Sequence, residues 1–313
     1  MFNTPVLLII FNSPDTTQKV LDRLREIKPR FLYVTADGAR SNVKADIKLC
    51  LEARAIVEQI DWECELHTNF HDSNQGLKTA ISSGITWFFD SVEQGIILED
   101  DCVPNKSFFR FCEELLEKYK NDQRVMSISG NNFQDGNVGE GSYYFSRLTK
   151  IWGWATWRRS WLLLDLNLKQ YSSFKSSNQI ENIFNDSFTK KFWMAKMEAE
   201  NKGGNSWAFP WAFTHFLNNG LCITPNKNLV TNIGYREGAT HATNEDSILA
   251  NLQTEEIPYL HHPKYMIPQL EADRRWTRLA AKEQFTIRMR LETWIRSLIP
   301  NPVKIYLKSR FLK

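Results

Sequence analysis

The sequence of 313 residues lacks the features that mark membrane-spanning, secreted and zinc-binding proteins. Its N-terminal apolar run, Val6 to Phe11, is far shorter than the ~20 residues of a transmembrane helix, and no basic segment precedes it as in a signal peptide. The five cysteines are scattered, odd in number and without a C-x-x-C pair, which argues against a disulfide framework or a zinc site. We therefore expect a cytoplasmic protein.

The sequence also lacks a strong charge of either sign. A net charge of +3 is too small to favour nucleic acid as a partner, so none is expected. The distribution is uneven, because the chain from Lys282 onward carries eight Lys/Arg against two Glu, a balance of +6 that leaves −3 for residues 1–281. The basic end is therefore the part of the chain where an anionic partner would bind.

Glycine-rich phosphate loops are missing as well. Neither G-x-G-x-x-G nor G-x-x-x-x-G-K follows any predicted strand, which argues against a dinucleotide-binding or P-loop site. Nucleotidyltransferases on similar sheets usually carry a glycine-rich loop and a lysine after the first strand. The segment Ile10-Phe11-Asn12-Ser13-Pro14 has neither.

The chain does contain enough apolar material for a full core, at 42% hydrophobic and 13% aromatic residues. Its first hundred residues alternate short apolar runs with amphipathic stretches, a pattern typical of βα units in a parallel sheet. Strands are expected at 6–10, 31–35, 63–68, 95–98 and 125–129, with helices at 14–28, up to about 60, and 75–90. This predicts an α/β, Rossmann-like domain over 1–265 with a mostly parallel sheet, followed by a basic helical extension over 266–313.

Polar residues follow four of these strands. Ligands of open parallel sheets bind at the carboxyl ends of the strands, which places Asn12, Asp37, Asn74 and Glu99-Asp100-Asp101 along one rim. Chance alone gives roughly half an acidic triplet in a chain of this composition. However, three carboxylates after a buried strand repel one another unless a cation or hydrogen-bond donors compensate them. The alternative is a solvated turn that caps a helix beginning near Asn105.

His241 is a second candidate metal ligand, in a loop rich in glycine and threonine. As a ligand, its imidazole would join carboxylate and phosphate oxygens around an ion such as Mn²⁺. As an ordinary polar surface residue it would have no such role, and the sequence leaves both interpretations open.

The segment from Trp152 to Trp161 is rich in tryptophan. Trp154, Trp157 and Trp161 recur at i, i+3 and i+7, which favours the core face of a helix over a platform for ligand stacking. Gly153 has no side chain, so a sugar or a backbone segment can approach it closely.

The C-terminal extension predicts an amphipathic basic helix. Its apolar face is formed by Ile287, Leu291, Trp294, Ile295 and Leu298, with arginines elsewhere around the helix. Such a helix suits an anionic membrane surface. Packing against the preceding domain is the equally favoured alternative.

Taken in order, the motifs of this chain resemble those of bacterial family-2-like glycosyltransferases of the GT-A type, which are related to the Golgi N-acetylglucosaminyltransferase that initiates complex N-glycans. The resemblance covers residues 4 to about 265. It is carried by Pro5-Val6-Leu7 to Asn12, Ala36-Asp37-Gly38, Asn74-Gln75-Gly76-Leu77, Ile97-Leu98-Glu99-Asp100-Asp101, Trp152-Gly153-Trp154, and Asn232-Ile233-Gly234 running to Ala239-Thr240-His241.

The resemblance implies a nucleotide-sugar site, with a UDP-sugar favoured as donor and Mn²⁺ or Mg²⁺ as cofactor. It implies that Asp37 and Asn74 contact the base or ribose, that Asp100 contacts the ribose or metal, and that Asp101 binds the metal. Glu99 would reach the donor sugar. Asn12, Gly153 and Arg236 are further candidates for donor binding, the last beside the diphosphate. The implied acceptor is a glycan or lipid-linked glycan of bacterial surface polysaccharide synthesis, and the implied transfer inverts the anomeric carbon.

One departure from the family concerns the catalytic base. Relatives commonly carry an acid between two tryptophans, whereas this chain reads Trp207-Ala208-Phe209-Pro210-Trp211. Glu237 is the first substitute for this base, and Glu99 is the second. The alternative is a catalytically degenerate relative that binds nucleotide or glycan at the membrane.

Overall fold

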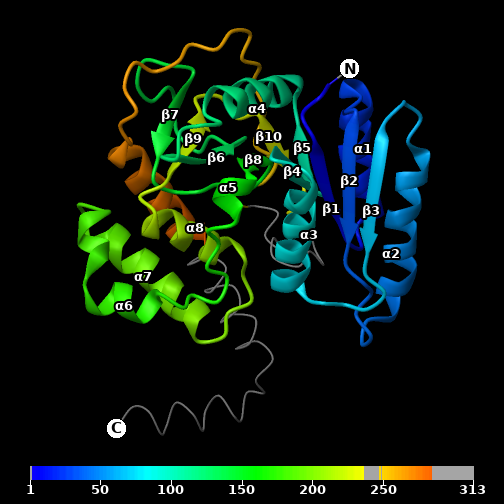
Figure 1. Ribbon diagram of the computed structural model, residues 1–313, viewed down its shortest axis with the longest axis horizontal. Coiled ribbons are helices and arrows are strands. Elements are labelled where there is room, and N and C mark those ends of the chain that lie inside the picture. The colour runs from blue at the N-terminus through cyan, green and yellow to red at the C-terminus, as the bar shows by residue number, and fades with distance from the viewer. Residues whose placement is uncertain (1, 236–246, 248, 284–313) are drawn as a thin grey trace, which may run out of the picture.

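The computed structural model describes residues 2–235, 247 and 249–283, which build a mixed α/β structure around an eight-stranded sheet (Figure 1). The strands lie in the order β3-β2-β1-β4-β8-β6-β9-β7. Six of them run in one direction, and only β7 and β8 run in the other. The predicted α/β class with a mostly parallel central sheet is confirmed. The strands are β1 (Val6–Ile10), β2 (Phe31–Ala36), β3 (Glu65–Phe70), β4 (Gln94–Glu99), β6 (Val125–Ser129), β7 (Tyr143–Ser146), β8 (Trp154–Trp157) and β9 (Leu221–Pro225).

Helices cover both faces of this sheet. The core on one face packs against α1, α2 and α4, and the core on the other face packs against α3, α5 and α8. A third apolar cluster joins α6, α7 and α8. The helices are α1 (Pro14–Ile27), α2 (Lys44–Ile56), α3 (Leu77–Ser91), α4 (Lys106–Lys118), α5 (Arg158–Trp161), α6 (Tyr171–Ser176), α7 (Ser187–Asn201) and α8 (Ala208–Leu217), with short 3₁₀ turns at Val57–Gln59 and Gln179–Asn182.

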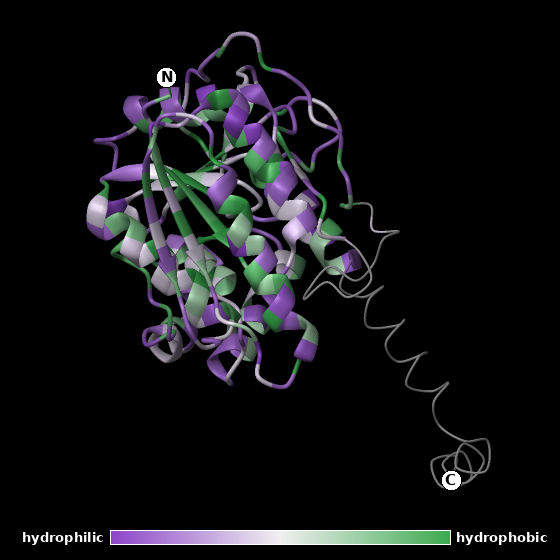
Figure 2. Ribbon diagram, turned by 90° about the vertical axis from the view of Figure 1, so that its right-hand side faces the viewer, coloured by the Kyte–Doolittle hydropathy of each residue, from purple (hydrophilic) through white to green (hydrophobic). Residues whose placement is uncertain are grey.

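Strand β1 shows why the N-terminal half adopts this arrangement. All five of its residues are buried, with Val6, Leu8 and Ile10 in the core beside α1 and α2. Leu7 and Ile9 point to the opposite core beside α3. Because both faces are covered, the strand is a continuous apolar run, and each fully buried aliphatic side chain contributes about 1.5–3 kcal/mol. Figure 2 shows this difference in hydropathy between interior and surface, with hydrophobic strands inside and hydrophilic residues along the helices that cover them.

The tryptophan-rich segment differs from the sequence prediction. Trp154 to Trp157 form strand β8, and the short helix α5 begins only at Arg158, so the predicted continuous helix is wrong. In a strand, residues three apart lie on opposite faces, and Trp154 and Trp157 accordingly belong to different cores. The predicted core role is confirmed, since Trp154, Trp157 and Trp161 are each at most 3% exposed.

Residues 270–283 form a helix that packs beside the edge strand β7. Asp273 is 2% exposed and accepts hydrogen bonds from Ser146 Oγ at 2.5 Å and from the Arg147 backbone N–H at 3.0 Å. Trp276 stacks on Phe133 with ring centroids 4.2 Å apart. This described part of the extension therefore packs against the sheet domain.

The membrane-facing residues predicted from Ile287 onward lie outside the described residues. Within the described ranges, no helix combines the length and apolar character needed to cross a bilayer.

Candidate functional site

The predicted rim exists, because the first four parallel strands end together. Ile10 pairs with Ala36, Ile9 pairs with Glu99, and Ala36 pairs with Phe70. The loops that follow β1, β2, β3 and β4 therefore leave the sheet at one edge. These loops carry the predicted residues Asn12, Asp37, Asn74 and 99–101.

Asp37 joins the loop after β2 to the loop after β3. Its Oδ1 accepts the backbone N–H groups of Gly38 and Gln75, both at 2.8 Å. Its Oδ2 accepts the Asn74 side-chain amide at 2.8 Å and the Gly76 N–H at 3.1 Å. The structure thus brings the two predicted residues Asp37 and Asn74 together, bonded to each other.

Gly38 is required by the close approach of these two loops. A Cβ at Gly38 would lie 2.4 Å from the carbonyl carbon of Ser73. The motifs around Asp37 and Asn74 therefore form one structural unit, in which a carboxylate with four donors fixes the loop 73–76.

Asn12 lies in a second polar cluster beside this unit. Its side-chain amide donates to Asp46 Oδ1 at 2.9 Å, and Asp46 is only 1% exposed. Arg40 donates to both carboxylate oxygens of Asp46 and lies 5.6 Å from the ring centre of Phe11. The Arg40 hydrogen bonds are the main reason that the pKa of Asp46 lies below its ordinary value. Sequence reasoning missed the Arg40–Asp46 pair, whose meaning depends on this tertiary contact.

The acidic loop after β4 is tied to the end of β1. Asp100 Oδ2 accepts the Phe11 backbone N–H at 3.0 Å. The loop does not cap the following helix, because the Asn105 side chain does so by accepting the Phe108 N–H at 3.0 Å. Burial raises the pKa of Glu99 well above its ordinary value, and the neighbouring charges of Asp101 and Asp100 raise it further.

A small two-stranded sheet positions Asp101. Strand β5 (Cys102–Pro104) pairs antiparallel with β10 (Val230–Asn232), so residues 232–234 lie against the acidic loop. The Ile233 N–H donates to the Asp101 carbonyl at 2.9 Å, and the Asn232 amide donates to Asp101 Oδ1 at 3.3 Å. Two motifs about 130 residues apart in sequence therefore meet at one carboxylate.

Gly234 allows the 232–235 loop to approach that carboxylate closely. A Cβ at this position would lie 2.1 Å from Asp101 Oδ2, too close for any side chain without movement. Only glycine fits the observed approach of the 232–235 loop to the acid.

Gly153 is explained by packing within the protein. It has a positive φ of 68°, and a Cβ there would lie 2.8 Å from Val230 Cγ2 and 3.3 Å from Leu98 Cδ2. Its carbonyl accepts the Gly130 N–H at 2.8 Å. The sequence predicted that either a sugar or a backbone segment approaches Gly153 closely. The structure shows protein atoms in that position.

Three predicted site residues, Arg236, Glu237 and His241, lie outside the described residues. Over the described ranges, no group of three or more His, Cys, Asp or Glu side chains is arranged to hold a metal ion. Asp100 and Asp101 offer two carboxylates. This set fits an ion such as Mg²⁺, which typically takes one or two protein carboxylates together with substrate phosphates and water.

The residues described so far define an α/β protein with polar and acidic side chains gathered at the carboxyl edge of its parallel strands. No protein-family model and no curated protein matches the chain. Among solved structures, the galactosyltransferase LgtC in complex with donor and acceptor sugar analogues is 9% identical over 70% of this chain and 72% of its own, with a TM-score of 0.37.

Two further solved structures match this chain with similar sequence identities and TM-scores. Mouse xyloside xylosyltransferase 1 is 12% identical, with 68% of this chain and 81% of its own covered and a TM-score of 0.34. A cytidylyltransferase from Leptospira borgpetersenii is 12% identical over 53% of this chain, with a TM-score of 0.33, and the match spans 64% of its length.

Proposed function

We propose that this protein is a metal-dependent glycosyltransferase of the GT-A type, which moves a sugar from a nucleotide-diphosphate sugar to a hydroxyl group of a glycan. The observation that carries the proposal is the meeting of Asp101 with the 232–234 loop, at the edge where four parallel strands end. The family resemblance of the sequence favours a UDP-sugar, inversion at the anomeric carbon, and an acceptor in bacterial surface polysaccharide synthesis.

In this proposal the nucleotide lies over the ends of β1 and β2. Asp37 acts as a positioning residue, because its carboxylate already accepts four donors from the adjoining loops. Asn74 is exposed and lies in the loop 73–76, which Asp37 fixes. This loop then presents polar groups to the base or ribose. Phe11 and Arg40 offer an aromatic face and a cation at the same end of the site.

The diphosphate lies beside the acidic loop. Asp100 and Asp101 would hold Mn²⁺ or Mg²⁺, and the bound ion would stabilise the charge that develops on the leaving diphosphate. Asn232 orients Asp101 through Oδ1, and the backbone of Gly234 lies close to Oδ2. His241 is proposed as a further ligand and Arg236 as a further diphosphate contact.

The acceptor hydroxyl must lose a proton as it attacks the anomeric carbon. Glu237 is proposed first for this base. Glu99, which directly precedes Asp100, is proposed second and is the one of the two among the described residues.

The test measures nucleoside diphosphate release from UDP-glucose, UDP-galactose, UDP-N-acetylglucosamine and GDP-mannose, with Mn²⁺ or with EDTA. We expect release from at least one donor with Mn²⁺ only, and a loss on the order of 100-fold or more in Asp101→Asn. Asp61→Asn is the matched control, since Asp61 is an exposed acid paired with Arg25. Metal-independent release, or equal release by wild type and Asp101→Asn, would refute the proposal.

A second candidate function is nucleotide or glycan binding without turnover. It is favoured by Ala208, which begins α8 where relatives commonly carry an acid. A protein of this kind would show a Mn²⁺-dependent rise in melting temperature with a nucleotide and no product release.

A further inference from the structure

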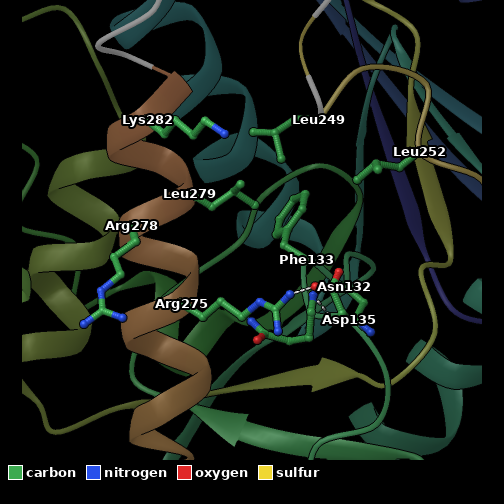
Figure 3. Close-up of a pocket in the computed structure, with 10 residues that line it drawn as sticks. Asn132, Phe133, Asp135, Leu249, Leu252, Arg275, Arg278, Leu279 and Lys282 are labelled. Atoms are coloured by element: carbon green, nitrogen blue, oxygen red, sulfur yellow. Dashed lines mark hydrogen bonds and ion pairs between the residues drawn. The ribbon is translucent and has the colours of Figure 1, made fainter.

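A cavity of about 480 Å³ lies between the loop after β6 and helix 270–283. Its volume falls within the ~300–1,000 Å³ range of small-molecule pockets. The loop after β6 and residues 249–252 face helix 270–283 across it (Figure 3). The lining residues that matter for its chemistry are Phe133, Asp135, Leu249, Arg275, Leu279 and Lys282.

Aromatic contacts connect this pocket to the site at Asp101. The Trp152 ring lies 5.4 Å from Phe133, which lines the pocket, and 5.7 Å from Tyr235. Tyr235 directly follows Gly234, whose backbone approaches the Asp101 carboxylate. The pocket is therefore connected to the loop at Asp101 through the rings of Trp152 and Tyr235.

Two cationic side chains and one leucine form a stripe on the pocket side of the helix. Arg275, Leu279 and Lys282 are spaced i, i+4 and i+7, and Figure 3 shows all three directed toward the pocket. Arg278 also lines the pocket, and Figure 3 shows its guanidinium directed away from Arg275 and Lys282. The helix thus contributes three cations to the lining, of which Arg275 and Lys282 are directed into the pocket.

The ion pair at the pocket rim can exchange partners. Arg275 pairs with Asp135, and their side chains are 47% and 87% exposed. Exposed pairs of this kind contribute little stability, so an incoming anion competes with Asp135 for the guanidinium at small cost. Asp135 therefore acts as a weak competitor for an anionic ligand.

We infer that this pocket recognises the acceptor through an anionic group, a carboxylate or a phosphate carried on a sugar. The inference rests on the proposed function, which supplies the role of acceptor. Arg275 and Lys282 would contact the anion, because an arginine binds planar carboxylate or phosphate oxygens in pairs and a lysine adds a point charge. Leu249 and Leu279 would contact the apolar face of the sugar ring.

The experiment measures the binding of glucose, glucuronate and glucose 6-phosphate by isothermal titration calorimetry. We expect the neutral sugar to bind at least tenfold more weakly than one of the charged sugars, and the better charged sugar identifies the anion. Inorganic phosphate is titrated as a separate arm, to show whether the sugar ring adds affinity beyond the anion.

Four variants locate the binding. Arg275→Gln and Lys282→Gln should each weaken charged-sugar binding by roughly tenfold, while Asp135→Asn should strengthen it by freeing Arg275. Arg274→Gln is the matched control, with the same charge change on the same helix at a residue that pairs with Glu271 and Asp186 and does not line the pocket, and it should bind as wild type does. Equal binding by Arg275→Gln, Asp135→Asn and the wild type would overturn the inference, as would a weakening only in Arg274→Gln.

The measurements distinguish failure of the pocket inference from failure of the proposed transferase function. Asp101→Asn should bind charged sugars normally, because Asp101 does not line the pocket. Mn²⁺-dependent nucleotide release without charged-sugar binding would overturn the pocket inference alone. Charged-sugar binding at Arg275 without any nucleotide release would support the pocket and contradict the proposed transferase.

Discussion

At the scale of single residues, Asp37 shows how a buried carboxylate organises two loops. Its two oxygens accept four donors, three of them backbone N–H groups of the loops after β2 and β3. These donors offset its charge, and among the residues that the structure describes no cation forms an ion pair with this carboxylate. The backbone of the 73–76 loop is therefore held in place before a ligand arrives.

Asp37→Asn tests this organisation. An asparagine offers one acceptor oxygen and places an amide against the Asn74 amide, so we expect stability to fall by about 2 kcal/mol or more. Nucleotide affinity should weaken with it, because the loop loses its fixed position. Urea unfolding measures the first effect, with Asp72→Asn, an exposed acid in the same loop, as control. If Asp37→Asn unfolds like the control, the carboxylate does not hold the loops.

His215 is a second residue whose environment predicts a measurable effect. Burial lowers its pKa to about 4 from an ordinary 6.5, and its ring nitrogens contact Ser127 Oγ and the Trp211 carbonyl. The folded state keeps the ring neutral, whereas the unfolded chain takes up a proton below pH 6.5. The contribution to stability is therefore complete above pH 6.5 and is lost as pH falls toward 4.

The pH effect is measured against His215→Gln, which cannot titrate. Between pH 7.5 and 4.5, wild type should lose about 2–3 kcal/mol more than the variant, at ~1.4 kcal/mol per pKa unit. Other groups, such as Glu99, are present in both proteins and cancel in the comparison. Parallel pH curves for the two proteins would show that His215 does not titrate as described.

At the scale of secondary-structure elements, the β5–β10 ribbon determines the geometry around Asp101. The ribbon brings residue 232 opposite residue 102, and this register places Gly234 against the carboxylate. Its strands have three residues each, too few for their hydrophobic pattern to be recognised in the sequence. The residues of the site were predicted, but the ribbon that joins them was not.

Two glycine substitutions separate site geometry from packing. Gly234→Ala should abolish Mn²⁺-dependent nucleotide binding with little loss of stability, because its Cβ would displace Asp101 Oδ2. Gly153→Ala should instead lower stability by about 1–3 kcal/mol, since φ is positive and Val230 occupies the space. Thermal unfolding with and without UDP and Mn²⁺ distinguishes the two. Identical behaviour of the two variants would contradict this division.

The accuracy of sequence prediction also varied by element. Strands β1, β2 and β4 follow the predicted ranges closely, because a strand covered on both faces is a continuous apolar run. Strand β8 was predicted as a helix, because the spacing of Trp154, Trp157 and Trp161 coincides with a helical period. The Arg40–Asp46 pair was missed because only the folded loop brings Arg40 to the first turn of α2.

At the scale of the whole molecule, helix 270–283 joins two distant parts of the structure. Asp273 holds the helix to β7, and the same helix provides the cationic wall of the pocket. Burial raises the pKa of Asp273 and lowers that of Lys150, whose Nζ contacts Ser146 and Thr224. The buried polar network around Asp273 therefore holds the edge of the sheet to the helix that lines the pocket.

Asp273→Ala tests this coupling. We expect a loss of stability of about 2–4 kcal/mol, because the Ser146 hydroxyl and the Arg147 N–H lose their acceptor and Lys150 loses a nearby anion. Glu271→Ala, on an exposed position of the same helix, should cost less than about 0.5 kcal/mol. Equal unfolding midpoints in urea would show that the helix is held by other contacts.

The central claim is that Asp101 and a divalent cation hold the diphosphate of a nucleotide at the edge of the sheet. Isothermal titration calorimetry of UDP, in Mn²⁺ and in EDTA, tests it on wild type and Asp101→Asn. The account predicts saturable binding by wild type in Mn²⁺, with binding at least tenfold weaker both in EDTA and in the variant. UDP affinity that is the same in all four titrations would contradict it.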